Sequence, residues 1–342
     1  MRLGLMIGYS GRELNIDLET VLEAERLGYD SVWSAESWSS DAIAPLAWLA
    51  AQTSRIKLGT GVMQLPCRTP TAAAMAAQTV DALSGGRLLM GLGTSGPQVV
   101  EGWHGMPFEK SLTWLREYVL ICRQVFAREG ALEFSGDRFQ IPYTGPGSTG
   151  QGKALKSMLH GRKDIPIYTG SMAPKSQQMC AEIADGCLLT CMVPGCDEVL
   201  LENFRQGFAK SNGRNSEGDF EVLPTVGIHI CDDMDAAYEP FRDQLCLYVG
   251  GMGSKEKNFY KDYLSKCGFE AECAQIQSLF LSGDRAGARA AVSNALIDAV
   301  HLVGPRDRIR DRLQRYRDSI TTTLVVGSFD RDTVRFMAEI AS

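Results

Sequence analysis

The sequence predicts an α/β protein, a (β/α)8 TIM barrel with insertions, and three observations support this. Short apolar runs that end in Gly, Thr or Ser alternate with amphipathic stretches along the chain, as expected for parallel strands covered by helices. Eight such runs are present, which is the strand number of this barrel. A plain barrel takes about 250 residues, and two irregular segments, 130–162 and 234–296, account for the surplus in this chain of 342 residues. We therefore expect a single domain over residues 1–342 in which both segments are insertions.

The first half of the chain supplies four strands, each followed by a helix. Gly28 ends the first helix, Asp17–Leu27, and Pro45 lies in the first turn of the second, positions that these residue types favour. Gly85 and Gly86 stop the third helix, Thr71–Leu83. One face of this helix carries Met75, Ala76, Thr79 and Leu83. The expected strands are Arg2–Gly8, Ser31–Ala35, Ile56–Met63 and Arg87–Leu92.

The second half continues the alternation with one long interruption. The helix Ser111–Arg128 keeps a period of 3.6 residues, and segment 130–162 is rich in Gly and Pro, so we expect an excursion there. Segment 234–296 is mainly helical, with a Gly-rich interruption at Tyr248–Gly253. The expected strands are Ile165–Thr169, Cys187–Val193, Phe220–Cys231 and Thr322–Gly327, and the expected helices are Pro174–Ala184, Glu198–Lys210, Arg306–Tyr316 and Arg331–Ile340.

A doubly wound sheet is the structural alternative. Such a sheet usually carries a Gly-rich phosphate loop after its first strand. The corresponding residues here, Tyr9-Ser10-Gly11-Arg12, do not form a dinucleotide-binding fingerprint, which favours the barrel.

Composition excludes several classes of partner. The net charge is −6 and no basic run is interleaved with aromatics, so we expect no nucleic acid. No apolar run approaches the roughly 18 residues of a membrane span, and the N-terminus lacks the features of a signal peptide, so we expect a cytoplasmic protein with a small-molecule substrate. Among ten cysteines, Cys187, Cys191 and Cys196 come closest to a cluster, but no His lies nearby, and we expect no metal.

The expected strand ends form a neutral rim. The rim contains no Ser-His-Asp set, no paired carboxylates and no His cluster, and it therefore suits a large planar ligand held by backbone groups, with the chemistry supplied by that ligand. Its residues are Tyr9, Ser10, Glu36, Ser37, Trp38, Gly61, Val62, Met63, Gln64, Thr94, Ser95, Gly96, Gly170, Ser171, Met172, Val193, His229, Gly327 and Ser328.

Two ionisable residues at this rim are candidates for proton transfer. Glu36 is the one carboxylate at the end of an otherwise apolar strand. It either faces a cofactor ring or serves as a loop charge that pairs with a neighbour or caps the helix near residue 43. His104, next to Trp103, is a second candidate, although a His–Trp pair of this kind is more often a packing feature.

The segment Gly170-Ser171-Met172-Ala173-Pro174-Lys175 joins the fifth strand to a helix. Ser171 is a candidate cap for that helix, and Pro174 lies in its first turn. Free N–H groups, the helix dipole and Lys175 would favour a phosphate. An ordinary capped helix is the alternative.

Several segments together resemble the bacterial-luciferase-like superfamily and, within it, the coenzyme F420-dependent oxidoreductases. They are LGTGV (58–62), LSGGRLLMGLGTSGPQVVEGW (83–103), LREYV (115–119), IPIYTGSMAPK (165–175), AEIADG (181–186) and HLVGPRDRIRDRLQRY (301–316). The resemblance covers nearly the whole chain and keeps the segments in order. It implies a barrel whose strand ends bind a deazaflavin, and it suggests a homodimer.

The resemblance also implies roles for particular residues. The bond Gly61–Val62 matches a non-prolyl cis peptide behind the deazaflavin ring, and Glu36 matches an acidic residue near that ring. Thr94, Ser95 and Gly96 belong to the loop after the fourth strand, which contacts the cofactor. Gly170 and Ser171, with Lys175 nearby, match the segment that holds the cofactor phosphate.

Two departures from the family pattern bear on the substrate. The sugar-phosphate dehydrogenase branch has Asp-His where this chain has Glu36-Ser37, which argues against a sugar phosphate. Position 96 is Gly where some relatives carry Glu, so that general acid is absent. Glu36 is then the first candidate for proton transfer and His104 the second.

The sequence therefore predicts an F420-dependent oxidoreductase that transfers a hydride between C5 of the deazaflavin and a small organic substrate. One alternative is an FMN-dependent, two-component monooxygenase with the same fold. A second alternative is a non-catalytic deazaflavin-binding subunit.

Overall fold

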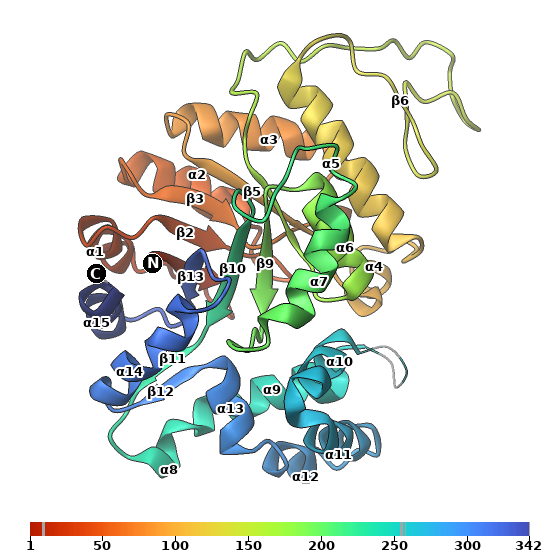
Figure 1. The fold of residues 1–342 in the computed structure, drawn as a ribbon. Coiled ribbons are helices and arrows are strands. Elements are labelled where there is room, and N and C mark those ends of the chain that lie inside the picture. The colour runs from red at the N-terminus through yellow and green to blue at the C-terminus, as the bar shows by residue number, and fades with distance from the viewer. Residues whose placement is uncertain (9–10, 254–255, 257, 342) are drawn as a thin grey trace.

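A computed structural model describes residues 1–8, 11–253, 256 and 258–341. Tyr9 and Ser10, which the sequence analysis assigned to the first strand end, lie outside the described residues. Figure 1 shows a barrel of strands surrounded by helices, with a separate group of helices at one end. The two chain ends lie side by side because β1 pairs with β13, the last strand of the barrel.

Eight parallel strands form the barrel within the described residues, as predicted. The barrel closes because β3 pairs with β5 as well as with β2. A short strand, β4 (Met63–Gln64), continues from β3 along β5. The eight strands are β1 (Arg2–Gly8), β2 (Ser31–Ser34), β3 (Lys57–Thr60), β5 (Leu88–Gly93), β8 (Ile167–Gly170), β9 (Gly186–Thr190), β10 (Glu221–Val226) and β13 (Thr323–Val326).

The helices that cover the barrel begin and end within two residues of the predicted positions where a prediction was made. Asp17 caps α1 by accepting from Glu19 N and Thr20 N, and Pro70 opens α3. The shell contains α1 (Leu18–Arg26), α2 (Ile43–Gln52), α3 (Pro70–Leu83), α4 (Pro97–Gly102), α5 (Ser111–Ala127), α6 (Pro174–Ile183), α7 (Asp197–Phe208), α14 (Arg306–Arg317) and α15 (Arg331–Ala341). A 3-10 turn, η1 (Leu65–Cys67), precedes α3.

Side chains fill the barrel interior. Trp33 is fully buried there, together with Leu89, Tyr168, Leu188, Leu223 and Val325. Gly59 makes room for the indole, because a Cβ at this position would lie 2.2 Å from Trp33 Cε3. Met6 and Val62 pack on this interior cluster and are only partly buried.

The face of α3 that was predicted from apolar spacing is the outward one. Met75 and Leu83 are 62% and 68% exposed, whereas Ala73, Ala77 and Val80 are buried. Small residues face the barrel because α3 packs closely on α2 and α5. A search for large apolar residues therefore selected the wrong side of this helix.

The predicted seventh strand, Phe220–Cys231, is in fact two strands. It breaks at Gly227, where a Cβ would lie 2.3 Å from the Phe241 ring, and continues as β11 (Ile228–Ile230). β11 leaves the barrel and pairs with β12 (Leu302–Gly304), a strand that the sequence did not predict. His229 is consequently in this side sheet, with its ring Nδ1 2.9 Å from Ala237 O.

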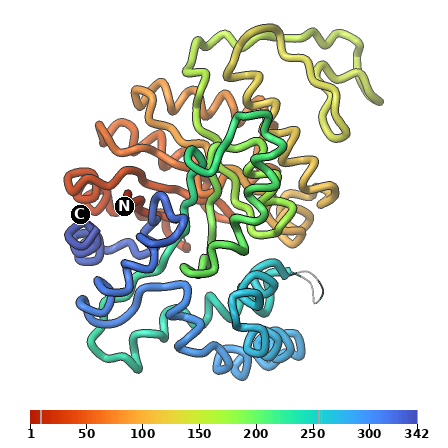
Figure 2. Tube along the Cα trace, in the orientation of Figure 1, coloured from red at the N-terminus to blue at the C-terminus, as the bar shows by residue number. Residues whose placement is uncertain are grey.

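The two irregular segments lie at opposite ends of the barrel (Figure 2). Segment 130–162 contains an antiparallel pair, β6 (Phe134–Ser135) and β7 (Gln140–Ile141). The other segment is helical. The interruption predicted at Tyr248–Gly253 begins only at Met252, because α9 continues through Gly250 and Gly251, which pack close to Phe280. Its elements are α8 (Met234–Ala237), α9 (Glu239–Gly251), α10 (Phe259–Leu264), η2 (Ser265–Phe269), α11 (Glu270–Leu281), α12 (Arg285–Ala290) and α13 (Asn294–Val300).

None of the helices in the described ranges combines the length and the apolar character that crossing a membrane requires.

Candidate functional site

The predicted site residues lie at the carboxyl ends of the barrel strands, where TIM barrels bind their ligands. Gly61 and Val62 connect β3 to β4, and residues 94–96 connect β5 to α4. Thr94 donates to Ser95 O, Ser95 has a φ of 60°, and Gly96 precedes α4 as its N-cap. These loops surround one opening, which we call the barrel mouth.

Val62 lies at the mouth, close to the ends of β5 and β8. The Gly61–Val62 peptide is cis. A Cβ on Gly93 would lie 2.6 Å from Val62 Cγ2, and a Cβ on Gly170 would lie 3.4 Å from Val62 Cγ1. Bare backbone on both sides therefore accommodates the valine, and the result is a small apolar surface ringed by peptide groups. Such a surface fits one face of a planar deazaflavin or flavin ring.

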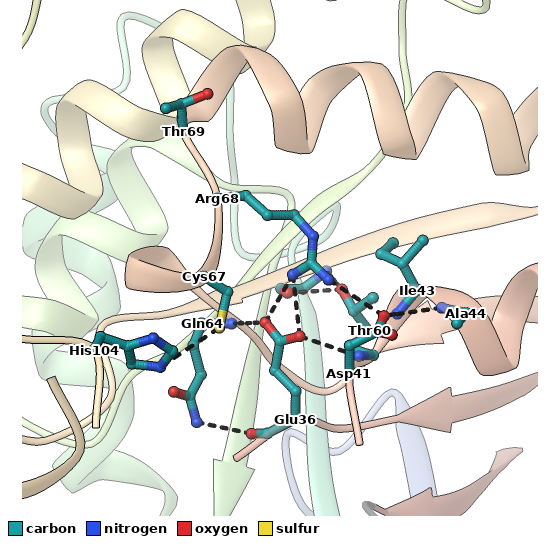
Figure 3. Close-up of polar contacts among 12 residues, drawn as sticks. Glu36, Asp41, Ile43, Ala44, Thr60, Gln64, Cys67, Arg68, Thr69 and His104 are labelled. Carbon is teal, nitrogen blue, oxygen red and sulfur yellow. Dashed lines mark hydrogen bonds and ion pairs between the residues drawn. The ribbon is translucent and has the colours of Figure 1, made fainter. Parts of the chain in front are cut away.

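Glu36 is buried beside this surface, and its carboxylate is surrounded by donors (Figure 3). Oε1 accepts from Gln64 N at 2.7 Å, and Oε2 accepts from Ala42 N at 3.1 Å. Arg68 Nη1 lies 3.0 Å from both oxygens. A charged guanidinium and two backbone N–H groups thus compensate the buried charge.

The backbone of Glu36 is bound to the same segment. Its N–H donates to Val62 O at 3.3 Å, and its carbonyl accepts from Gln64 Nε2 at 2.8 Å. Asp41 accepts from Ile43 N and Ala44 N at the start of α2 and also pairs with Arg68. Glu36 therefore connects the end of β2 to β4 and to the start of α2, the arrangement given above as the alternative to a cofactor contact. Its contact with a cofactor stays a prediction.

His104 meets a cysteine that the sequence analysis did not single out for the site. Its Nε2 lies 3.7 Å from Cys67 Sγ (Figure 3). Burial, followed by the negative charge of Glu36, raises the pKa of the Cys67 thiol to about 12. The thiol therefore stays protonated near neutral pH and serves His104 as a weak hydrogen-bonding partner rather than as a thiolate.

The segment predicted to hold a phosphate lies across the mouth from Glu36. Ser171 does not cap α6 as expected, because its buried hydroxyl shares a hydrogen bond of 3.0 Å with Thr169 Oγ1. The N-cap of α6 is Ala173, which offers no side-chain acceptor, so N–H groups of the first turn have no capping partner from this residue. Lys175 is exposed in that turn.

Two amide side chains fix the segment before α6 through hydrogen bonds. Gln177 Nε2 donates to Met172 O at 3.0 Å, and Asn203 Nδ2 donates to Gln177 Oε1 at 2.8 Å. A cavity of about 500 Å³ lies between the first turn of α6, at Pro174, and the helical insertion, where Phe259 and Lys266 line it. The segment is thus held in place next to open space.

Sequence reasoning missed Arg68, Cys67 and Gly93 as members of the site. Arg68 could have been noticed, since it is the only charged residue in the sequence between Lys57 and Asp81. Its link to Glu36 joins residues 32 positions apart, so spacing could not reveal it. Gly93 lies in a Gly-rich turn of a common type, and Cys67 had no signal.

The barrel and its mouth define a class of protein, and a comparison with known families agrees. The luciferase-like monooxygenase family matches residues 1–323. The chain belongs to this family and is an enzyme of the luciferase-like superfamily.

The similarity to individual relatives extends over nearly the whole chain. A Mycobacterium tuberculosis protein named "Putative coenzyme F420-dependent oxidoreductase" is 43% identical over 99% of both chains. A 5,10-methylenetetrahydromethanopterin reductase of Archaeoglobus fulgidus is 30% identical over 89% of this chain and 87% of its own. Among solved structures, the coenzyme F420-dependent tetrahydromethanopterin reductase of Methanopyrus kandleri superposes with a TM-score of 0.78 at 24% identity, covering 99% of this chain and 97% of its own. This last likeness concerns the fold.

Proposed function

We propose that this chain is an F420-dependent oxidoreductase that transfers a hydride between the deazaflavin and a small organic substrate. The observation that carries the proposal is the apolar Val62 surface, bordered by Gly93 and Gly170, in a chain 43% identical to the mycobacterial relative. A neutral surface of this kind suits a ring that itself supplies the chemistry.

The chain's own residues would bind and orient the cofactor. Val62 would support one face of the ring, and Glu36 would keep Val62 in place through the hydrogen bond to its carbonyl. The first turn of α6, with Lys175, would receive the phosphate, because unpaired N–H groups and a cation favour an anion. When bound, the deazaflavin supplies or accepts the hydride at C5.

His104 is the residue we propose for the proton that accompanies the hydride. The Glu36 carboxylate accepts from three donor groups, whereas the Nε2 of His104 faces a weak partner, Cys67. With Nε2 so oriented, Nδ1 would exchange the proton with the substrate heteroatom. The sulfur can accept from Nε2–H after Nδ1 has given up its proton, so both charge states of the ring keep a partner.

Parallel titrations with F420 and with FMN test which cofactor the protein prefers. Fluorescence quenching monitors binding in both titrations. We expect micromolar or tighter binding of F420 and much weaker binding of FMN. Preference for FMN would instead support the two-component monooxygenase. Binding of F420 without turnover over a broad set of ketones, enones and imines would support a non-catalytic subunit.

Substitution of His104 tests the proton-transfer proposal. His104→Gln should lower kcat about 10²-fold, within the usual range for loss of a general acid or base, and leave F420 affinity unchanged. Cys67→Ala should shift the pH profile of kcat, because the partner of Nε2 is removed. An unchanged kcat for His104→Gln would exclude the role.

We also propose a homodimer in which α2 and α3 of two copies face each other. α2 contains no charged residue, and the one in α3, Asp81, is buried against Arg162. Trp48 is 43% exposed and Met75 62% exposed on these helices. By contrast, α14 carries eight charged residues among its 12, as a helix that faces water usually does. An uncharged face of two adjacent helices suits a self-complementary contact.

Sedimentation of the full chain tests the dimer. We expect a dimer for the natural sequence and a monomer for the double substitution Trp48→Glu, Met75→Glu. Leu281→Glu, at a position 48% exposed on α11, is the matched control and should remain dimeric. A monomeric natural chain would exclude the proposal.

A further inference from the structure

Two pairs of cysteines come into contact in this protein, and the pairs differ in burial. Cys180 in α6 and Cys187 in β9 share a side-chain hydrogen bond and are fully buried. Cys196, between β9 and α7, and Cys267, in η2, also share a side-chain hydrogen bond, but both are only partly buried. All four are free thiols. The second pair is therefore the one that a reagent in solution can reach.

The contact between Cys196 and Cys267 joins the barrel to the helical insertion. Cys196 is the N-cap of α7 in the shell of the barrel, whereas Cys267 belongs to the insertion. Tyr263 of the insertion shares a hydrogen bond with Cys267, and its hydroxyl accepts from Val193 N, in the loop after β9, at 3.0 Å. The two thiols thus meet where the insertion packs against this loop.

This contact lies next to the cavity of about 500 Å³ described above. Ser265 and Lys266, which directly precede Cys267, line that cavity together with Pro174 at the start of α6. A covalent bond at Cys267 would therefore hold one wall of the cavity against the barrel.

We propose that Cys196 and Cys267 form a reversible disulfide bond that fastens the helical insertion to the barrel. The oxidant is a low-molecular-weight disulfide such as oxidised glutathione. The thiolate of one cysteine attacks a sulfur of the oxidant and releases one glutathione thiolate, and the second cysteine then attacks the mixed disulfide and releases the other. The two cysteines lose two protons and two electrons, and the oxidant becomes two thiols. This inference goes beyond the proposed function and does not depend on it.

The order of the two attacks follows from the surroundings of Cys267. Burial, followed by the contact with Cys196, raises the pKa of the Cys267 thiol. Because the thiolate is the nucleophile, Cys267 is a poor first attacker. Cys196 therefore attacks the oxidant, and Cys267 resolves the mixed disulfide.

Peptide mapping by mass spectrometry tests the bond on the folded, full-length chain. The protein is incubated with oxidised glutathione, its remaining thiols are alkylated, and its peptides are analysed before and after reduction with dithiothreitol. We expect a Cys196–Cys267 linked peptide that reduction removes, and no linkage between Cys180 and Cys187.

Two variants sharpen this test. Cys267→Ser lacks the resolving thiol and should carry glutathione on Cys196. Cys231→Ser removes another partly buried thiol and is the matched control, which should form the same linked peptide as the natural chain. Absence of the linked peptide from the natural chain would overturn the proposal. Linkage of Cys180 to Cys187 at the same rate would also overturn it, because the bonds would then arise from an opened chain.

Hydrogen exchange measures whether the bond fastens the insertion. In the oxidised chain the amides of α10 and α11 should exchange about ten-fold more slowly than in the reduced chain, because local opening of the insertion is restrained. The amides of the β6–β7 hairpin should exchange at the same rate in both. Equal exchange of α10 and α11 in the two forms would refute the fastening role.

Discussion

The two ends of the barrel use ionisable residues in different ways. At the amino ends of the strands, Arg2 pairs with Glu221, which also accepts from the Tyr168 hydroxyl. Burial, followed by the charge of Glu221, raises the pKa of Tyr168. The Tyr168 ring meets Trp33 edge-on at 5.6 Å, so side chains bonded to one another close this end.

At the carboxyl ends the charged residues pair with one another and also bind backbone N–H groups. Glu36 and Arg68 hold the segment 61–64 and the start of α2, and the interior surface there is left to Val62 and two glycines. The comparison teaches that one end of the barrel is closed by contacts between side chains, while the other fixes the main chain and leaves apolar surface for a ligand.

The largest expected effect comes from the buried charge at the mouth. Glu36→Gln should lower the free energy of unfolding by about 3–5 kcal/mol, because it breaks a buried ion pair and leaves Arg68 incompletely compensated. Denaturant unfolding measures this loss. The same variant should bind F420 more weakly, since the side-chain contacts that fix Gln64 N and Arg68 next to Val62 are weakened.

Glu117→Gln is the control for this variant. Glu117 is a buried carboxylate that accepts from three backbone N–H groups, those of Asp137, Arg138 and Phe139, far in sequence from the mouth. It should lose stability but keep F420 affinity. A Glu36→Gln protein of natural stability that lacks turnover would identify Glu36 as a proton carrier and refute the positioning role.

A pair of glycine substitutions compares the ends directly. A Cβ on Gly186, at the closed end, would lie 2.6 Å from Glu221 O and 2.7 Å from the Tyr168 ring, whereas a Cβ on Gly93 meets only the side chain of Val62. Gly186→Ala should therefore cost about 3 kcal/mol and Gly93→Ala about 1 kcal/mol, the upper and lower parts of the range for overpacking. Thermal unfolding gives the stabilities.

The effect on cofactor binding should have the opposite order. Gly93→Ala should weaken F420 binding and Gly186→Ala should not, because only Gly93 touches the Val62 surface. Equal effects on binding would mean that the two ends are not functionally distinct.

A buried histidine that takes no part in the proposed reaction should make the stability of the protein depend on pH. His301 is buried, its Nδ1 accepts from Gly227 N at 3.0 Å, and burial lowers its pKa to about 3. Below pH 6.5 the unfolded chain takes up a proton that the folded chain excludes, so stability falls as the pH drops from about 6.5 towards 3. At pH 5 this term amounts to about 2 kcal/mol, since each pKa unit contributes about 1.4 kcal/mol.

His301→Gln should remove this part of the acid sensitivity while it keeps an acceptor for Gly227 N. Unfolding midpoints of the two proteins at pH 7 and pH 5 measure it. The same fall in stability on acidification for both proteins would exclude His301 as the source.

The smallest effect concerns one hydrogen bond at the closed end. Tyr168→Phe should cost about 1 kcal/mol, because Glu221 keeps its partner Arg2 and only a single bond is lost. F420 titration should show no change in affinity. Weaker cofactor binding would indicate that the closed end also shapes the mouth.

Local patterns allowed much of the fold to be predicted. The strands from Arg2–Gly8 to Thr323–Val326 were found because parallel barrel strands are short apolar runs, and helix ends were found because Gly28 and Pro174 act through their own backbone preferences. The break of the seventh strand at Gly227 was missed, since it depends on the Phe241 ring of another element.

The candidate site was predictable only in part, for a similar reason. The loops that carry Glu36, Val62 and Gly170 follow from the order of strands. The partners of those residues do not: Arg68 reaches Glu36, and Cys67 reaches His104, across 32 and 37 positions. The local sequence does not predict which hydrogen-bond donor a carboxylate will contact.

The sequence alone determined the alternation of strand and helix, the closed barrel and the loops that form the mouth, because these depend on the spacing of apolar residues and on the conformations of Gly and Pro. Only the tertiary structure decided which face of α3 is outward and that the carboxylate of Glu36 is already bonded to Arg68 and two backbone N–H groups. It likewise decided that Trp38 and Trp103 are exposed whereas Trp33 and Trp114 are buried. Exposure and hydrogen-bond partners are properties of residues brought together from distant parts of the chain, and they exist only after the barrel has closed.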